Sequence, residues 1–225
     1  MIVAVVPMKA LALAKRRLSA TLPERERRQL VRAMLCDVLT ALRACAHVER
    51  TFVVTSDPEV AELAARHGAG HIPEEAPAGL NRALATAAGY LADIGAGAML
   101  IIPGDVPLVT TAEIAELASL SRPGGMTIVP AHDGDGTNAL LLSPPGALAP
   151  AFGPGSFRRH VEAGRKAGLA PAVRPLDGLG RDIDAAADLA ILMRRKDGNP
   201  EYGFLRRAAA RDFAGTGQAM ERERA

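Results

Sequence analysis

The chain has 225 residues, and its 27 Lys and Arg against 25 Asp and Glu leave a formal net charge of +2. This balance argues against a nucleic-acid coat or a polybasic membrane binder, and 3% aromatic residues without tryptophan argue against a base-stacking platform. No apolar run approaches the ~18 residues needed to span a bilayer, and no basic segment precedes the apolar N-terminus. We therefore expect a cytoplasmic protein without a secretory signal.

Short apolar runs alternate along the chain with segments of helical periodicity. Strands are expected at 1–6, 51–55, near 70, and at 98–102, 126–130, 139–142 and 170–173. Helices are expected at 23–44, 58–67, 80–91, from 110 or 111 to 120, and at 156–167 and 185–195. This alternation predicts an α/β fold around a largely parallel sheet.

The two cysteines, Cys36 and Cys45, both fall in the first predicted helix. A spacing of nine residues places them on opposite faces, so they do not bridge each other, and a reduced compartment is the simplest interpretation. After this α/β domain, assigned to 1–195, the breaker cluster at Lys196 begins a polar segment. We expect 196–225 to be an appendage that is partly ordered or disordered.

The segment after the first strand contains the cations Lys9, Lys15 and Arg17 but no glycine. It is therefore neither a dinucleotide fingerprint nor a P-loop. Lysine and arginine can instead neutralise a triphosphate directly. The alternative is a solvated basic loop.

Aspartates follow a later strand and precede the last helix. Asp105 comes directly after the strand at 98–102, where a carboxylate fixed by Gly and Pro suits Mg²⁺. Asp182 and Asp184 are two residues apart, so an extended backbone points both to one side. The alternatives are a turn role for Asp105 and an N-cap role for Asp184. Carboxylates together with a basic loop favour metal-assisted phosphoryl or nucleotidyl transfer.

Two further segments suggest ligand contacts at helix starts. Gly153-Pro154-Gly155-Ser156 opens a helix whose free N–H groups can bind an anion, with positive charge expected from Arg158, Arg159 and His160. Thr137 and Asn138, after a Gly/Asp-rich turn, are its expected partners, and an N-capping Ser156 is the alternative. Gly79-Leu80-Asn81 can present N–H and amide groups to a purine, or Asn81 can cap the helix.

The ordered set of motifs resembles the 2-phospho-L-lactate guanylyltransferase family, up to about Leu192. The segments that carry the resemblance are Val5-Val6-Pro7-Met8-Lys9, Ala14-Lys15-Arg16-Arg17-Leu18-Ser19, Gly79-Leu80-Asn81, Pro103-Gly104-Asp105-Val106-Pro107-Leu108, Asp135-Gly136-Thr137-Asn138-Ala139-Leu140, Phe152-Gly153-Pro154-Gly155-Ser156-Phe157 and Asp182-Ile183-Asp184. One departure is Arg16, which stands where Thr is common in the family.

The resemblance implies one α/β/α sandwich with a mixed, mostly parallel sheet, like that of nucleotide-diphospho-sugar transferases. It implies a guanylyltransferase that joins GMP from GTP, with Mg²⁺, to 2-phospho-L-lactate, phosphoenolpyruvate or 3-phospho-D-glycerate in coenzyme F-420 biosynthesis. A downstream transferase would consume the labile product, and the chain would act as a monomer or homodimer.

The combined hypothesis gives each of these segments a role. Asp105, Asp182 and Asp184 would hold the metal, and Lys9, Lys15 and Arg17 would neutralise the triphosphate. Guanine would lie against Gly79, Leu80 and Asn81, and the acceptor's phosphate against Thr137, Gly153, Gly155 and Ser156. Alternatives are a nucleotidyltransferase with a sugar-phosphate or molybdenum-cofactor acceptor, and a GTP-binding module without catalysis.

Overall fold

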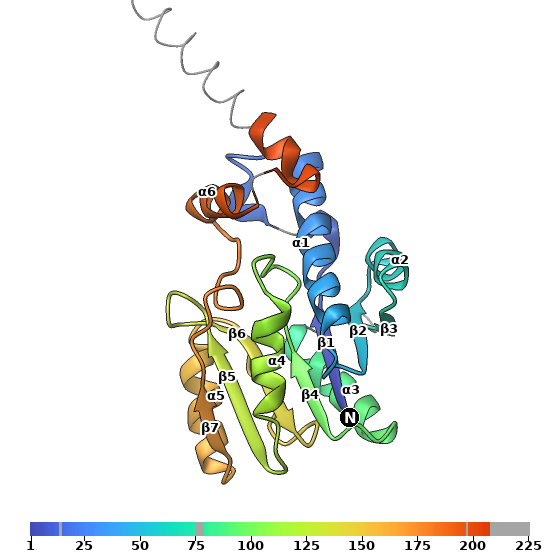
Figure 1. Cartoon of the computed structure of the whole chain (residues 1–225), viewed down its shortest axis with the longest axis vertical. Coiled ribbons are helices and arrows are strands. Elements are labelled where there is room, and N and C mark those ends of the chain that lie inside the picture. Colours follow the sequence, from blue (N-terminus) through green and yellow to red (C-terminus); the bar gives the residue numbers. More distant parts are fainter. Residues whose placement is uncertain (14, 75–78, 197, 208–225) are drawn as a thin grey trace, which may run out of the picture.

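The computed structural model describes residues 1–13, 15–74, 79–196 and 198–207. The expected α/β fold with a mixed, mostly parallel sheet is confirmed (Figure 1), and its seven strands lie in the order β3-β2-β1-β4-β6-β5-β7. Strand β6 is antiparallel to both of its neighbours, and the other pairs are parallel. The strands are β1 (Ile2–Pro7), β2 (Arg50–Thr55), β3 (Gly70–Pro73), β4 (Ala98–Ile101), β5 (Gly125–Pro130), β6 (Thr137–Ser143) and β7 (Ala170–Val173).

Helices cover both faces of the sheet, close to the predicted boundaries. They are α1 (Glu24–Ala44), α2 (Pro58–Arg66), α3 (Leu80–Asp93), α4 (Thr111–Ser119), α5 (Ser156–Lys166) and α6 (Ala186–Arg195). Side chains of α1, α2, α4 and α6 build one apolar cluster, and those of α3 and α5 pack in a second cluster on the other face. The start of α4 is fixed by Thr110, whose hydroxyl accepts from Glu113 N–H while the Glu113 carboxylate accepts from Thr110 N–H.

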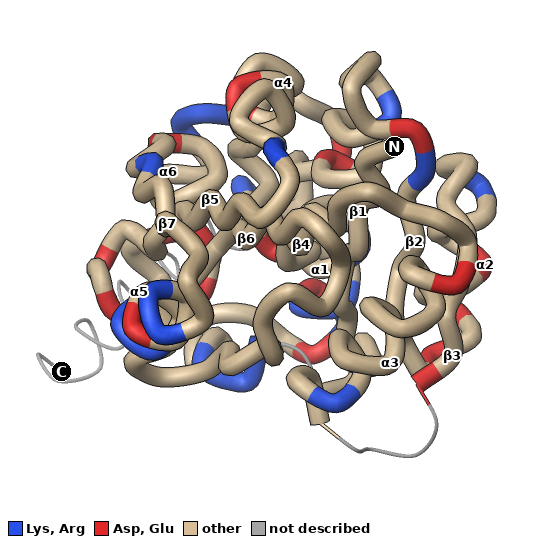
Figure 2. Tube along the Cα trace, turned by 90° about the horizontal axis from the view of Figure 1, so that it is seen from below, with Lys and Arg blue, Asp and Glu red and all other residues tan. Residues whose placement is uncertain are grey.

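The polar surface of the domain carries both signs of charge. Viewed from below, basic and acidic positions alternate around the outside of the trace, and α5 carries both (Figure 2). This mixture agrees with the nearly neutral composition. Cys36 is half-buried, Cys45 is buried, and both are free thiols. Within the described ranges, the fold has no helix with the length and apolarity that a membrane crossing requires.

The beginning of the expected appendage packs onto α1. Tyr202, Phe204 and Leu205 are buried in the same cluster as the α1 side chains. The Tyr202 hydroxyl donates to Asp37 Oδ2 at 2.7 Å, and Lys196 Nζ lies 3.1 Å from the same oxygen. Residues 198–207 therefore extend the core of the domain, whereas 208–225 lie outside the described residues.

Candidate active site

The candidate site lies at the carboxyl end of the sheet, where the strand order reverses. From β1 the chain adds β2 and β3 on one side, and it later returns to place β4 on the other side of β1. Ligands of open α/β sheets bind outside the carboxyl ends of strands at such a switch point. The segments that carry Lys15 and Asp105 leave β1 and β4 at this end of the sheet (Figure 1).

The segment after β1 is anchored on both sides of Lys15. Leu11, in the 3-10 turn η1 (Leu11–Leu13), and Leu18, in η2 (Arg16–Leu18), are buried. The Leu11 N–H donates to Asp57 Oδ2 at 2.9 Å, which ties the segment to the start of α2. Lys15 adopts a left-handed backbone with φ 53°, which is uncommon for a residue with a side chain. The anchored leucines on each side hold this turn in place.

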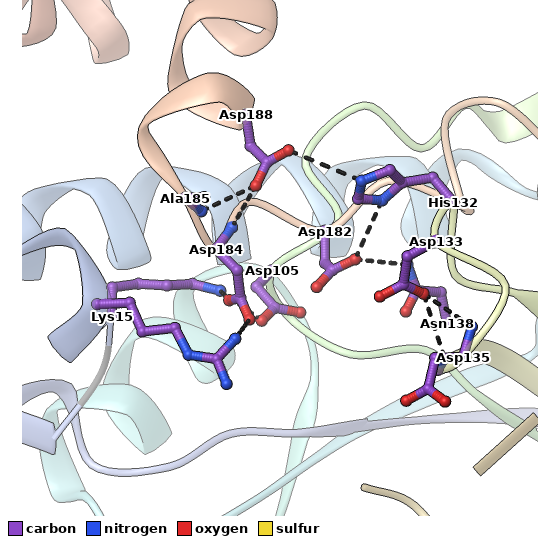
Figure 3. A network of polar contacts seen from close by, with 12 residues as sticks. Lys15, Asp105, His132, Asp133, Asp135, Asn138, Asp182, Asp184, Ala185 and Asp188 are labelled. Atoms are coloured by element: carbon purple, nitrogen blue, oxygen red, sulfur yellow. Dashed lines mark hydrogen bonds and ion pairs between the residues drawn. The ribbon is translucent and has the colours of Figure 1, made fainter. Parts of the chain in front are cut away.

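Lys15 lies between two of the predicted metal ligands (Figure 3). Its Nζ donates to Asp105 Oδ2 at 2.7 Å and to Asp184 Oδ1 at 2.6 Å, and its side chain is only 7% exposed. Burial alone would lower the pKa of Lys15, but the two carboxylates outweigh it and the pKa is raised. The ammonium is therefore charged and fully engaged by the aspartates.

The other two predicted cations are more open to solvent. Arg17 Nη1 lies 3.6 Å from Asp184 Oδ2, and the Arg17 side chain is 84% exposed. Lys9 is exposed just beyond the end of β1. Of the three basic residues, the structure brings Lys15 into close contact with the aspartates and Arg17 to their edge.

Asp105 is positioned by a tight approach between two loops. A Cβ at Gly104 would collide with the Sδ of Met8, so any larger residue in the turn after β4 would require the Met8 side chain to shift. The Asp105 carbonyl accepts from Ile183 N–H at 3.1 Å, and Ile183 is buried. This hydrogen bond holds the segment between Asp182 and Asp184 against Asp105.

The third aspartate shares the electrostatic field of the first two. Burial raises the pKa of Asp182, and the negative charges of Asp105 and Asp184 raise it further, while a hydrogen bond from Asn138 opposes them. The Asn138 amide donates to Asp182 Oδ1 at 3.1 Å. His132 Nδ1 lies 3.8 Å from the same oxygen. Asp182 thus lies close enough to Asp105 and Asp184 to feel their charge, while its own hydrogen bond comes from Asn138.

Asp184 does not cap the last helix, which was one alternative. The N-cap is Ala185, and the carboxylate of Asp188 accepts from the N–H groups of Asp184 and Ala185 at 3.1 and 2.8 Å. Asp188 therefore does the capping from the first turn of α6, and it leaves the Asp184 carboxylate facing Lys15 (Figure 3).

A β-bulge lies at the start of β6, at Thr137 and Asn138. The register between β5 and β6 passes from the pair of Val129 and Ala139 to the pair of Pro130 and Thr137, so Asn138 is the extra residue. Neither Asn138 nor the bulge could be placed from the sequence, because β6 was predicted to begin only at Ala139. One signal in the sequence could have indicated an irregular strand start, namely the polar pair Thr137 and Asn138 directly before the apolar run.

Thr137 contacts a buried histidine of α5. Thr137 Oγ1 lies 3.0 Å from His160 Nδ1, and His160 Nε2 accepts from Ala151 N–H at 2.9 Å. Burial lowers the pKa of His160 to about 4, with a smaller contribution from Arg159. The expectation that His160 adds positive charge is therefore wrong, because the ring is neutral at physiological pH.

The Gly-Pro-Gly-Ser turn has less free backbone than predicted. Gly155, with φ 68°, donates its N–H to Asp135 Oδ2 at 2.7 Å, and Ser156 donates its N–H to Gly153 O at 3.0 Å. Arg159 folds back so that its Nη2 donates to Ala151 O at 2.9 Å. Two of the N–H groups expected to meet a phosphate thus have partners within the chain, and the positive charge of Arg159 is directed to a carbonyl.

Asn81 makes a contact that the sequence reasoning did not foresee. Its Nδ2 donates to Phe152 O at 3.1 Å, and its Oδ1 accepts from Phe152 N–H at 2.7 Å. Both polar ends of the amide are thus occupied by backbone rather than presented to a purine. Gly79, with φ 86°, is exposed at the start of α3, and Leu80 packs partly against the core.

The fold and this site together define a class of protein. A protein from Desulfovibrio desulfuricans assigned to the nucleotide-diphospho-sugar transferases superposes with a TM-score of 0.76 at 19% identity, covering 93% of this chain and 95% of that one. A 4-diphosphocytidyl-2C-methyl-D-erythritol synthase superposes with a TM-score of 0.60 at 16% identity, covering 87% and 99%. The fold is therefore that of the nucleotide-diphospho-sugar transferases and cytidylyltransferases.

The family follows from the sequence comparisons. The family model described as guanylyl transferase CofC like matches residues 2–218, so the chain belongs to this family. The match continues past Leu192, where the resemblance was expected to end. A phosphoenolpyruvate guanylyltransferase of Sphaerobacter thermophilus is 42% identical, covering 84% of this chain and 91% of that protein. A 2-phospho-L-lactate guanylyltransferase of Methanothermobacter thermautotrophicus is 35% identical, covering 91% and 89%.

Proposed function

We propose that this chain transfers GMP from GTP to a phosphorylated three-carbon acid and releases pyrophosphate. Its family and the activities named for its relatives support this reaction. The observation that carries the proposal within the structure is the convergence of Asp105 and Asp184 on one cation at the switch point of the sheet. Phosphoenolpyruvate is the first acceptor to test, because the relatives with 42% identity are named for it.

The donor atoms around Lys15 fit a magnesium ion. Carboxylate oxygens are the ligands that Mg²⁺ takes in proteins, usually one or two of them together with substrate phosphates. Within the described residues, no ready-made group of three or more His, Cys, Asp or Glu side chains is arranged to hold a metal. Two carboxylates converge instead on the Lys15 ammonium, so Asp105 and Asp184 would hold the ion once Lys15 withdraws, with Asp182 beside them. When bound, Mg²⁺ supplies positive charge to the triphosphate.

The transfer itself needs little proton chemistry from the chain. An oxygen of the acceptor's phosphate forms a bond to the α-phosphorus of GTP, and the bond from that phosphorus to the oxygen bridging the α- and β-phosphates breaks. Because a phosphate monoester has its second pKa near 6, the attacking oxygen is already anionic at neutral pH. Catalysis then depends on positioning and on neutralising charge. Lys9, Lys15 and Arg17 would serve the triphosphate and the departing pyrophosphate.

The two substrates would approach from different sides of the candidate site. The exposed start of α3 at Gly79 and Leu80 would border guanine, with Asn81 holding the neighbouring loop through Phe152. The acceptor's phosphate would lie near Thr137 and the turn that contains Gly153, Gly155 and Ser156. The product would then be consumed by a downstream transferase in coenzyme F-420 assembly, as the family resemblance implies.

The test is Mg²⁺-dependent release of pyrophosphate from GTP with phosphoenolpyruvate, 2-phospho-L-lactate or 3-phospho-D-glycerate, with the downstream transferase present to trap the labile product. ATP, CTP and UTP are the nucleotide controls. Release with GTP and one acid is the expected result and identifies the acceptor. Tight binding of GTP without release with any of the three acids would refute the proposal and favour another acceptor or a non-catalytic role.

A further inference from the structure

His160 joins two parts of the expected acceptor pocket that lie far apart in the sequence. It is buried, with no exposed surface, and it lies one helical turn after Ser156 on α5. One ring nitrogen meets Thr137 of β6 and the other meets Ala151, just before the Gly-Pro-Gly-Ser turn. The Phe152 ring packs edge-on against the imidazole, with centroids 4.9 Å apart. The histidine is thus held from three directions.

The hydrogen bonds determine which ring nitrogen carries the proton. A backbone N–H can only donate, so His160 Nε2 must accept from Ala151. In a neutral ring the proton is then on Nδ1, which donates to Thr137 Oγ1. The hydroxyl accepts in this pair, so its own hydrogen remains available. Within the described ranges, no other protein group receives that hydrogen, although Thr137 is buried.

The bulge in β6 brings Thr137 to this histidine. Ala139 and Leu141 belong to one apolar cluster, and Leu140 and Leu142 belong to the other. Strict alternation would place Thr137 on the face of Ala139. The extra residue Asn138 reverses the alternation, and Thr137 meets α5 on the opposite face.

We propose that His160 is a positioning residue that fixes the Thr137 hydroxyl as a hydrogen-bond donor to the phosphate of the acceptor. The proposal rests on the proposed function, which places that phosphate at Thr137. A buried hydrogen-bond donor without a partner costs free energy. If it points at a bound anion instead, it forms a charge-assisted hydrogen bond that favours binding. The imidazole stays neutral and touches no substrate, so it acts through Thr137 alone.

The test compares two replacements that each keep one of the two hydrogen bonds. The amide of His160→Gln reaches the Nε2 position and can accept from Ala151, but it leaves Thr137 without its donor. The amide of His160→Asn reaches the Nδ1 position and keeps that donor. We expect His160→Gln to raise the KM for the acceptor about tenfold and to leave the KM for GTP unchanged. In His160→Asn, the KM for the acceptor should stay close to the wild-type value.

A double-mutant cycle with Thr137→Val separates a positioning role from a structural one. If His160 acts through the hydroxyl, His160→Gln causes no further rise of the acceptor's KM when Thr137 is already valine. Thr137→Ser keeps the hydroxyl and is the matched control. Additive effects, or equal rises in both KM values, would overturn the proposal. Long-range ¹H–¹⁵N spectra at pH 7 must also show the Nδ1–H tautomer, and an Nε2–H tautomer or an imidazolium would overturn it without any assay.

The outcomes for the two proposals remain distinguishable. A wild-type protein that turns over with one acid, together with a His160→Gln variant of normal acceptor KM, refutes only the role of His160. A wild-type protein that releases no pyrophosphate with any of the three acids refutes the proposed function, and the role of His160 with it.

Discussion

Two parts of the candidate site, one around Lys15 and one around His160, are stabilised in different ways. Around Lys15 the contacts join opposite charges, and the ammonium satisfies carboxylates that the proposed metal would also need. Around His160 the contacts are neutral hydrogen bonds between buried groups. If the proposed metal binds to Asp105 and Asp184, the charged side would have to exchange Lys15 for the metal, whereas the neutral side could keep its contacts. The comparison teaches that ion pairs at a site can be replaced by a charged ligand, whereas buried neutral hydrogen bonds need no replacement.

The largest expected effect comes from removing a carboxylate on the charged side. Asp105→Asn should lower kcat/KM by about 100- to 1,000-fold, because under the proposed function this carboxylate would hold the metal that neutralises the triphosphate. Initial rates of pyrophosphate release measure it. The matched control is Asp177→Asn, which loses a surface ion pair with Arg195. Near-normal turnover in Asp105→Asn would contradict the metal assignment.

Removing the contacts of Asn81 tests whether the neutral side is held in advance. Asn81→Ala deletes both hydrogen bonds to Phe152 and should lower the free energy of unfolding by about 2 kcal/mol. The KM for the acceptor should rise, while the preference for GTP over ATP stays unchanged. Chemical denaturation and nucleotide competition measure these effects, with Arg82→Ala as the exposed neighbouring control. If Asn81→Ala lost the preference for GTP, this result would support the earlier expectation that Asn81 contacts the purine.

Replacing Lys15 tests whether the charged side rearranges. In Lys15→Met the carboxylates of Asp105 and Asp184 lose their internal cation, so Mn²⁺ in the absence of nucleotide should bind about tenfold more tightly than to the wild type, a gain of about 1.4 kcal/mol. Calorimetry or electron paramagnetic resonance measures this directly. Lys9→Met is the control, because Lys9 is exposed. Equal Mn²⁺ affinity in all three proteins would show that the ammonium and the metal do not compete.

A pH dependence of stability is also expected from His160, and it changes the free energy of unfolding gradually over several pH units. The unfolded chain takes up a proton near pH 6.5, but the folded ring does so only near a pKa of about 4. The unfolded state therefore binds more protons in this window, and stability falls as pH falls through it, by at most about 1.4 kcal/mol per pH unit. Urea denaturation from pH 7 to pH 4 should show this slope in the wild type. His160→Gln should lack it, and an identical slope in both proteins would contradict the burial of a neutral ring.

Much of this fold could be predicted because its elements follow simple patterns. Val3 to Val6 form an apolar β-branched run that only a buried strand accommodates, and Asp57-Pro58 and Thr110 carry the capping chemistry of helix starts. The position of Asp105 could be predicted because it directly follows an apolar strand, at the end of the sheet where ligands of α/β folds bind. The order of the strands rests on long-range pairing that local patterns do not contain.

The finer features of the site depend on tertiary contacts. Nothing near His160 in the sequence says that Ala151 and Thr137 will occupy its nitrogens, so a histidine beside two arginines suggested charge rather than burial. The contact between Asn81 and Phe152 spans 71 positions and has no local signature. The capping by Asp188 could have been foreseen, because an acidic residue three positions after a helix start is a known pattern.

The extra residue in β6 also sets the distance between the proposed metal site near Asp182 and the proposed acceptor site at Thr137. Asn138 contacts Asp182, and Thr137 contacts His160, so adjacent residues of one strand reach two different parts of the candidate site. A single peptide bond links the two half-sites, and it is far stiffer than any contact between helices. Under the proposed function, the covalent geometry of the chain would therefore fix how GTP and the acceptor are aligned. Shortening this strand by one residue would separate the half-sites while leaving both apolar clusters intact.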